Sequence, residues 1–167
     1  MQGDLSETLS DDLFLTDEAE TGARTLSFRR SPTVLLSFAA NRFTRAAARE
    51  YQARFGIGAM DWRMLVMLTR EPGSTVSHSG RTIGIDKAAV SRSLRRLEAQ
   101  GLAAPDTVRS TEWHLTAAGH ALHAEILEVA LARQQRLLQG LSAEEVETFN
   151  RCLRVFLDNL DGLQAEN

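Results

Sequence analysis

The spacing of apolar residues predicts a chain built mainly from helices. From Pro32 to Arg54 apolar residues recur every three or four positions, which is the period of a helix with one buried stripe. A similar period returns after Gly58 and is ended by Glu71-Pro72-Gly73. The predicted helices cover residues 32–54, 60–69, 74–83, 87–100 and 117–138, and a last segment that follows residue 142.

Residues that favour helix ends lie between these segments. Gly84 stands where a turn between two helices needs a residue that tolerates a positive φ, and Asp86 then provides an N-cap. Gly101 ends the segment that starts at Lys87. Ser142 and the glutamate three residues later form a capping box for the last helix. The boundaries are therefore predicted by chemistry as well as by period.

Residues 102–116 predict a short β-hairpin. Pro105, Asp106 and Ser110 are turn-forming residues, and the stretch 112–115 alternates as a half-buried strand does. The expected fold class is mainly α, a winged helix-turn-helix with six helices and one hairpin wing. In this order of elements, residues 59–116 form one lobe that contains the hairpin, and residues 32–58 and 117–162 form a helical region.

The helix predicted over 87–100 has two different faces. Val90, Leu94 and Leu97 share one face at intervals of about 100° per residue. The opposite face is small, hydroxyl-bearing and basic, and consists of Ala88, Ser91, Arg92, Arg95 and Arg96. We expect the aliphatic face to be buried and the basic face to be exposed.

Charge is distributed unevenly along the chain, so the net charge of −3 is a poor guide. Residues 1–20 contain seven acidic residues and no basic one, whereas residues 81–96 contain five cations against one acid, Asp86. Local positive charge favours contact with phosphate. The acidic segment 1–31 has no sustained period and is interpreted as an arm, either disordered or with one short helix near residues 9–15.

A short helix, a glycine-containing turn, a basic second helix and a hairpin follow one another in the order of a winged helix-turn-helix. A recognition helix reads base edges with side chains near its start, while later cations contact phosphates. A solvated charged face is the alternative interpretation of the same arginines. The predicted DNA contacts are Lys87, Ala88, Ser91 and Arg92 for bases, Arg95 and Arg96 for phosphates, and Arg109 at the wing tip for a minor groove.

Five segments of the sequence resemble the MarR family of bacterial transcriptional regulators. They are Gly84 to Arg92, Leu97 to Leu102, Gly56-Ile57, Trp62 to Leu65 and Leu115 to Gly119. The resemblance implies a homodimer held by the first, fifth and sixth helices, which binds a pseudo-palindromic operator in double-stranded DNA as a repressor. It also implies release by a small ligand or by oxidation.

The chain departs from the family pattern in two places. The wing is several residues shorter than usual, and Asp106 to Arg109 replaces the customary Asp-x-Arg. Ser79 stands where a leucine is usual and is followed by Gly80, so the third helix is expected to be weak.

An effector pocket is implied between the dimerisation helices and the DNA-binding lobe. It would take an anionic aromatic ligand or its thioester, with Arg42 or Arg63 as counter-ion. Ordinary core packing is the alternative for the apolar members of this set. The candidate lining is Phe38, Arg42, Met60, Trp62, Arg63, Met64 and Met67.

Other functions receive less support from the sequence. Cys152 is the only cysteine, and neighbouring apolar residues favour partial burial and packing over redox sensing. His120 and His123 are three residues apart without further ligands at metal spacing, so neither a metal nor another cofactor is expected.

No catalytic constellation and no membrane-spanning segment is found, which predicts a cytoplasmic protein that is not an enzyme and has no membrane partner. A winged helix used only for protein contacts, or a redox-sensing regulator acting through Cys152, remains as an alternative.

Overall fold

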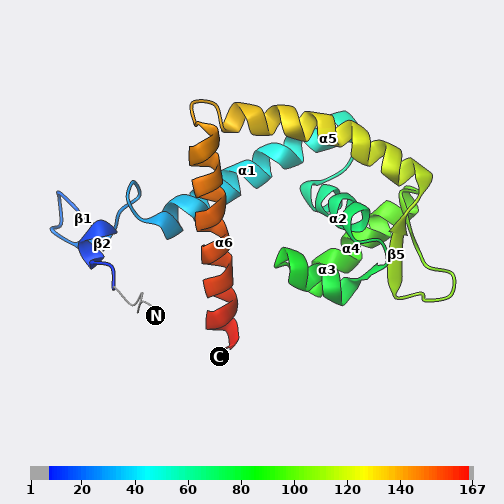
Figure 1. Ribbon diagram of the computed structural model, residues 1–167, viewed down its shortest axis with the longest axis horizontal. Helices are drawn as coiled ribbons and strands as arrows, with labels where there is room; N and C mark the ends of the chain where they lie inside the picture. The colour runs from blue at the N-terminus through cyan, green and yellow to red at the C-terminus, as the bar shows by residue number, and fades with distance from the viewer. Residues whose placement is uncertain (1–7, 166–167) are drawn as a thin grey trace. The chain divides into compact units, whose positions relative to one another are not determined.

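The structure, a computed structural model, describes residues 8–165 (Figure 1). The chain forms two compact units, of which the first ends at His120 and the second begins at Ala121. Among residues 8–165, no helix has both the length and the apolar character needed to cross a membrane.

Six α-helices account for most of the described residues, which confirms the predicted fold class. The predicted boundaries agree with the observed ones to within one residue, apart from the start of the third helix, which lies two residues later than predicted. The helices are α1 (Pro32–Phe55), α2 (Ala59–Arg70), α3 (Val76–Ile83), α4 (Lys87–Ala99), α5 (Ala117–Leu137) and α6 (Ala143–Ala165).

Helix ends follow the chemistry of the sequence. Gly56 ends α1 in the left-handed conformation at φ 69°. The Asp86 side chain caps α4 by accepting a hydrogen bond from the Ala89 amide at 2.9 Å. At the start of α6 the Ser142 amide donates to Glu145 Oε2 at 2.7 Å, and this bond is the first cause that lowers the pKa of Glu145. The predicted capping box is therefore present.

The first unit contains a three-stranded antiparallel sheet in the order β3-β5-β4. Strands β4 (Ala103–Pro105) and β5 (Glu112–Leu115) form the predicted hairpin. Strand β3 (Ser74–Thr75) corrects the prediction that the third helix begins at Ser74, because Ser74 pairs with Trp113 instead. The local period could not reveal this pairing, since the partner lies far along the chain.

The N-terminal arm is more ordered than the sequence pattern predicts. It contains a 3₁₀ helix, η1 (Asp11–Leu13), and a hairpin of β1 (Leu15–Asp17) and β2 (Arg24–Leu26). The 3₁₀ helix lies within residues 9–15, where a short helix was one of the two expectations, whereas the hairpin was not expected. Residues 1–7 lie outside the described residues. An ion pair between Asp12 and Arg24 joins η1 to the second strand.

The arm is attached to the start of α1 by an aromatic contact. The rings of Phe28 and Phe38 pack edge to face with centroids 5.1 Å apart. The Ser31 amide also donates to the Ser27 carbonyl at 3.0 Å, immediately before α1.

The core of the first unit lies between α2 and α4. Met64, Leu65 and Leu68 of α2 are buried, as are Leu94 and Leu97 of α4. Burial of such side chains stabilises the fold by roughly 1.5–3 kcal/mol each. This packing fixes the position of α4 in the winged-helix lobe.

Candidate nucleic-acid interface

The turn between α3 and α4 is tightly packed. The Ile85 amide donates to the Gly80 carbonyl at 2.9 Å, and a Cβ on Gly80 would lie only 2.9 Å from the Ile85 carbonyl oxygen. Gly80 therefore permits a close approach of two backbone segments, in addition to its cost in helix propensity. Gly84 completes the turn at φ 66°.

The outward face of α4 carries most of the predicted DNA contacts. Lys87, Ala88 and Arg92 are exposed, and Ser91 is half-buried. Val90 on the inner face is fully buried, which confirms the predicted division into an aliphatic and a basic face for this part of α4. Within residues 8–165, neither Lys87 nor Arg92 has an acidic partner. Two cations near the start of α4 therefore point to solvent uncompensated.

Arg96 is placed differently from the prediction. Its Nη2 and Nε atoms donate to the Asp61 carboxylate of α2 at 2.7 and 3.3 Å. Asp61 is only 3% exposed, and it also accepts hydrogen bonds from Ser93 Oγ at 2.6 Å and from the Gly58 amide at 3.1 Å. The guanidinium of Arg96 thus compensates a buried carboxylate, and Arg96 lies at the edge of the basic face.

Arg95 is directed toward the wing. Its guanidinium lies 5.5 Å from the centre of the Trp113 ring in β5 and pairs with Glu98 at 2.7 Å. The cation–π contact orients a side chain that remains two-thirds exposed. Arg95 therefore links the exposed face of α4, which carries the predicted DNA contacts, to strand β5 of the wing.

The wing turn is organised by one carboxylate. Asp106 accepts hydrogen bonds from the amides of Val108 and Arg109, both at 2.8 Å. These bonds, first that of Arg109, lower the pKa of Asp106 below its ordinary value. Arg109 is exposed at the tip and pairs with Glu112 at 3.0 Å. Its predicted insertion into a minor groove would require this surface pair to open.

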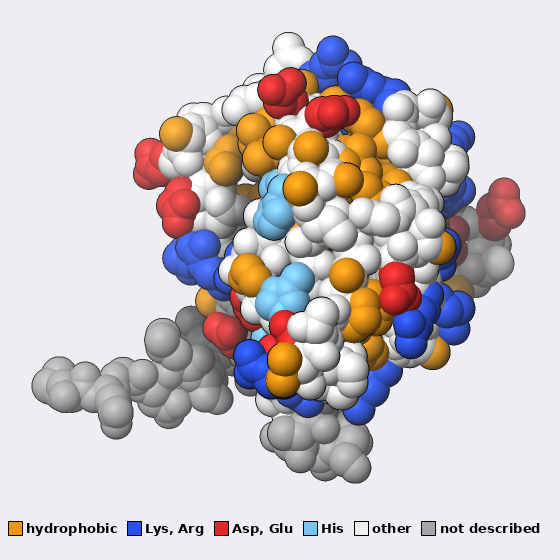
Figure 2. All heavy atoms as spheres, turned by 90° about the vertical axis from the view of Figure 1, so that its right-hand side faces the viewer, with side chains coloured by type: hydrophobic (Ala, Val, Ile, Leu, Met, Phe, Trp, Pro, Cys, Tyr) orange, Lys and Arg blue, Asp and Glu red, His pale blue; other side chains and the backbone are white. Residues whose placement is uncertain are grey.

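Figure 2 shows the wing side of the molecule, where Lys and Arg side chains gather toward the edges. Histidine and apolar side chains lie between them. Positive charge is thus not spread evenly over this side.

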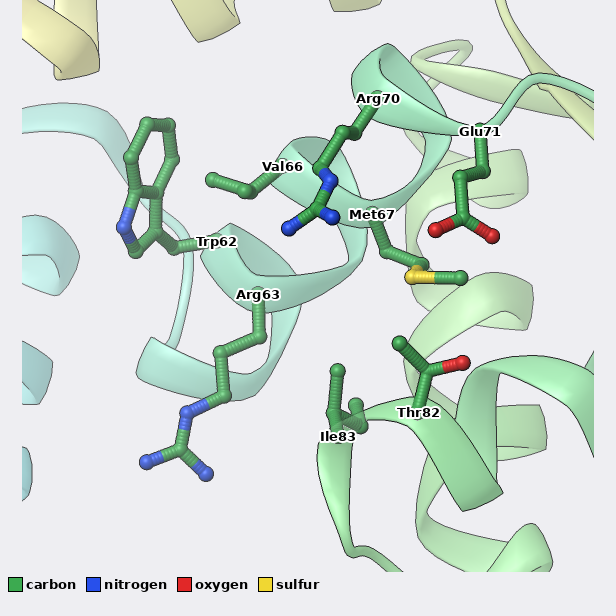
Figure 3. Close-up of a pocket in the computed structure, with 8 residues that line it drawn as sticks. All are labelled: Trp62, Arg63, Val66, Met67, Arg70, Glu71, Thr82 and Ile83. Carbon is green, nitrogen blue, oxygen red and sulfur yellow. The ribbon is translucent and has the colours of Figure 1, made fainter. Parts of the chain in front are cut away.

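A cavity of about 280 Å³ lies between α2 and α3. Side chains of the two helices face one another across it, with Met67 of α2 on one side and Thr82 and Ile83 of α3 on the other (Figure 3). Its lining consists of Trp62, Arg63, Val66, Met67, Arg70, Glu71, Thr82 and Ile83.

Only part of the predicted effector pocket lines this cavity. Trp62, Arg63 and Met67 do so, whereas Met64 is fully buried in the core and Phe38 packs on Phe28. The remaining two predicted members, Arg42 and Met60, are not among its lining residues. Arg70 and the α3 residues were missed because the sequence does not show which face of α2 lies against α3.

Cys152 is exposed on α6, which corrects the prediction of partial burial. Its apolar neighbours in the sequence indicated packing, but within the chain these neighbours are themselves half-buried or exposed. Among residues 8–165, no group of three or more His, Cys, Asp or Glu residues is arranged to hold a metal ion.

Comparisons with known proteins give a consistent result. The sequence model of the MarR family matches residues 55–109, which contain α2, α3, α4 and most of the wing. A MarR/EmrR family transcriptional regulator from Acinetobacter sp. ADP1 has a similar structure, with a TM-score of 0.77 and 25% identity, covering 82% of this chain and 99% of that chain. Over these residues, and in its fold, the chain is similar to MarR-family transcriptional regulators.

Further MarR-family structures resemble the chain. A regulator from Silicibacter pomeroyi has a TM-score of 0.69 and 25% identity, covering 80% of this chain and 92% of that chain. A MarR family protein from Mycobacterium tuberculosis has been solved in complex with DNA and in complex with p-aminosalicylic acid. Each of these structures has a TM-score of 0.60 and 26% identity, covering 75% of this chain and 98% of that chain. No curated protein sequence matches the chain significantly. The comparisons thus show a likeness to MarR-family transcriptional regulators in fold and in the sequence of residues 55–109.

Two polar features lie in the interior of the first unit. Ser79 is fully buried in α3, and within the described part of the chain its hydroxyl has no hydrogen-bond partner. Asp61 and Ser93 form a polar network that the sequence analysis missed. A signal for it was present, because Asp61 precedes Met64, Leu65 and Leu68 on one face of α2, and a buried carboxylate requires partners.

Proposed function

We propose that this chain is a MarR-family transcriptional regulator, a sequence-specific repressor that acts as a homodimer with α4 of each protomer in a major groove. The observation that carries the proposal is the outward face of α4, where Lys87 and Arg92 are exposed without acidic partners on a helix held from its inner side. The related Mycobacterium tuberculosis protein solved with DNA supports this use of the fold. As a DNA-binding regulator, the protein would act in the cytoplasm.

The geometry suggests a division of labour along α4. Ala88, Ser91 and Arg92 lie near its start and are proposed to contact base edges, where arginine pairs best with guanine. Lys87 and Arg95 are proposed phosphate contacts. Arg96 and Arg109 are proposed as weaker contacts, because each already pairs with a carboxylate: Asp61 for Arg96 and Glu112 for Arg109.

The homodimer is supported by apolar side chains that the single chain leaves exposed. Large apolar residues rarely remain exposed in such number on helices unless a partner covers them. A stable dimer of this kind also places two recognition helices on half-sites about 34–36 Å apart. The exposed large apolar residues on α1, α5 and α6 are Leu35, Phe38, Phe43, Leu127, Leu131, Leu137, Phe149, Val155, Leu157, Leu160 and Leu163.

The proposal is tested by selecting duplexes from a random pool with the purified full chain, and then measuring binding to the selected sequence. We expect a pseudo-palindrome. Arg92→Ala is expected to weaken binding to the selected sequence by about 1–3 kcal/mol, because a base contact would be lost. Its effect on binding to random DNA should be much smaller. Arg136→Ala, which removes an exposed arginine at the end of α5, is the matched control.

Three outcomes would contradict the proposal in different ways. Equal losses on selected and random DNA would make Arg92 a phosphate contact. Enrichment of no sequence, with salt-dependent retention, would leave a non-specific binder. Absence of retention at low salt would favour a winged helix used for protein contacts.

We further propose that the cavity between α2 and α3 takes a small aromatic carboxylate or its thioester. Arg63 and Arg70 supply positive charge, and Trp62 and Met67 supply apolar surface. The p-aminosalicylic acid complex of the Mycobacterium tuberculosis relative supports this ligand class. A ligand there contacts α3, so binding would alter the lobe that carries α4.

Thermal unfolding with p-aminosalicylic acid tests the ligand proposal. Binding is expected to raise the Tm of the full chain and of Arg136→Gln, but not of Arg70→Gln. A ligand-induced shift that persists in Arg70→Gln would place the ligand elsewhere, and no shift with any aromatic carboxylate would refute the proposal.

A further inference from the structure

The outward face of α1 carries a stripe of arginines that the proposed DNA contacts do not use. Arg42, Arg45 and Arg49 are spaced by three and four residues, so they share one side of the helix. All three are exposed, and within residues 8–165 none has an acidic partner. Tyr51 and Ala47, on the other side of α1, are buried. We refer to these three residues as the arginine stripe.

The same side of α1 changes character along its length. Leu35 and Phe38 lie one to two turns before the arginine stripe and are 44% and 39% exposed. The face is therefore apolar in its first half and basic in its second half. A segment that covers it must offer apolar side chains at one end and negative charge at the other.

The N-terminal arm has this complementary composition. Its described acids are Asp11, Asp12, Asp17, Glu18 and Glu20, and no basic residue precedes Arg24. Only Asp12 is paired in the described part of the chain, with Arg24. Four of the arm's large apolar side chains are exposed, namely Leu9, Leu13, Leu26 and Phe28, whereas Phe14 and Leu15 are half-buried.

The arm is too small to be stable without a further surface. Its two strands have three residues each, and an isolated two-stranded hairpin is at best marginally stable in water. Its side-chain contacts with α1 are the Phe28–Phe38 ring contact and a hydrogen bond between the Ser31 and Thr33 hydroxyls at 3.1 Å, both near the helix start. Exposed apolar residues on both the arm and α1 indicate that one apolar surface covers the other.

The arm does not reach the arginine stripe of its own chain as folded. The helix rises about 1.5 Å per residue, so Arg49 lies roughly 16 Å beyond Phe38 along the axis. The Glu18 amide donates to the Ala23 carbonyl at 2.9 Å, which closes the hairpin on itself. In an antiparallel pair of α1 helices, the arm at the start of one helix meets the second half of the other.

We infer that the acidic arm of one protomer docks on the arginine stripe of a second copy of this chain. Two observations favour the arm of a second copy as the segment that covers this face of α1. The arm is acidic where the stripe is basic, and both surfaces combine exposed apolar residues with charge. The inference goes beyond the proposed DNA-binding function but rests on the homodimer that is part of it. The arm then acts as a clasp that strengthens the dimer.

Cross-linking between two differently tagged chains tests the inference. Both carry Cys152→Ser, one carries Asp17→Cys in the arm, and the other carries Arg45→Cys in the stripe. Under mild oxidation we expect a mixed disulfide dimer, because docking brings the two Cβ atoms within bonding range. Arg81→Cys, which replaces an exposed arginine on α3, is the matched control and should form little of this species.

Sedimentation measures the same chains without oxidant. Arg42→Glu/Arg45→Glu/Arg49→Glu is expected to raise the dimer dissociation constant about tenfold, since several exposed pairs are lost together. Reversing the arm acids as well, with Asp17→Arg/Glu18→Arg, should restore part of the affinity. High salt should weaken the native dimer and abolish the difference.

The outcomes separate the arm from the dimer itself. A dimer that gives no mixed disulfide, or no more than the Arg81→Cys control, overturns the docking but leaves the proposed function intact. A chain carrying both Asp17→Cys and Arg45→Cys that closes only within itself shows docking in cis and also overturns the inference. A chain that sediments as a monomer overturns both the docking and the dimer.

Discussion

The buried carboxylate of Asp61 is expected to hold the recognition helix in place. Asp61→Ala removes the acceptor for three side-chain donors, two on Arg96 and one on Ser93, and for the Gly58 amide. Because Asp61 lies in α2 and two of its partners lie in α4, the change loosens the contact between these helices. Stability and DNA affinity should both fall.

The size of this loss in the free energy of unfolding follows from how exposed each hydrogen-bond partner of Asp61 is. The Ser93 bond is buried and charge-assisted, so its loss costs about 1.5–3 kcal/mol. Arg96 is 49% exposed, so solvent screens the ion pair and its loss adds at most about 1 kcal/mol. The unsatisfied Gly58 amide adds about 0.5–1 kcal/mol. The free energy of unfolding is therefore expected to fall by about 3–4 kcal/mol, which is a large part of the roughly 5–15 kcal/mol that is usual for a folded protein.

Urea unfolding at one fixed protein concentration measures this loss. With a slope of about 2 kcal/mol/M, the midpoint of Asp61→Ala should fall by roughly 1.5–2 M. Asp86→Ala, which removes an exposed N-cap of α4, is the control and should cost about 1 kcal/mol. Asp61→Asn keeps the shape of the side chain and one acceptor oxygen, so its urea midpoint should lie between those of Asp61→Ala and Asp86→Ala.

A double-mutant cycle identifies the pair responsible. Asp61→Asn and Arg96→Met are expected to couple by about 1 kcal/mol, since each change alone leaves the other group without its partner. The reasoning is refuted if Asp61→Ala costs no more than Asp86→Ala, or if the two changes are additive.

Further predictions concern close packing and the wing. Gly119→Ala should destabilise the chain by more than about 2 kcal/mol, because its Cβ would lie 2.0 Å from the Leu102 carbonyl oxygen. Gly162→Ala, with open space at the same atom, should instead stabilise it by up to about 1 kcal/mol, and equal thermal shifts for the two would contradict this account. In the wing, the pKa of Asp106 is lowered in the folded state, so its contribution is present above the ordinary carboxyl pKa and is lost as the pH falls through the lowered value. The protection of the Arg109 amide against hydrogen exchange, relative to its intrinsic rate at each pH, should therefore fall at acid pH in the native chain but not in Asp106→Asn. A pH profile of protection that is shared by both would contradict the prediction.

The sequence by itself determined the order, extent and ends of the helices and the hairpin. These features depend on residues within a few positions of one another, such as Asp86 with Ala89 and Ser142 with Glu145. The buried and exposed faces of α4 follow from the same local period, apart from the edge position of Arg96. The family resemblance also lies in these local segments.

Only the tertiary structure decided which residues from distant segments meet. Arg96 is drawn to Asp61 of α2, Ser74 pairs with Trp113, and α3 supplies one wall of the cavity. The arm folds into a hairpin through bonds between its two strands, although its sequence predicts disorder or one short helix and no strand. Contacts of this kind depend on the packing angles between elements, which no local pattern of apolar residues specifies.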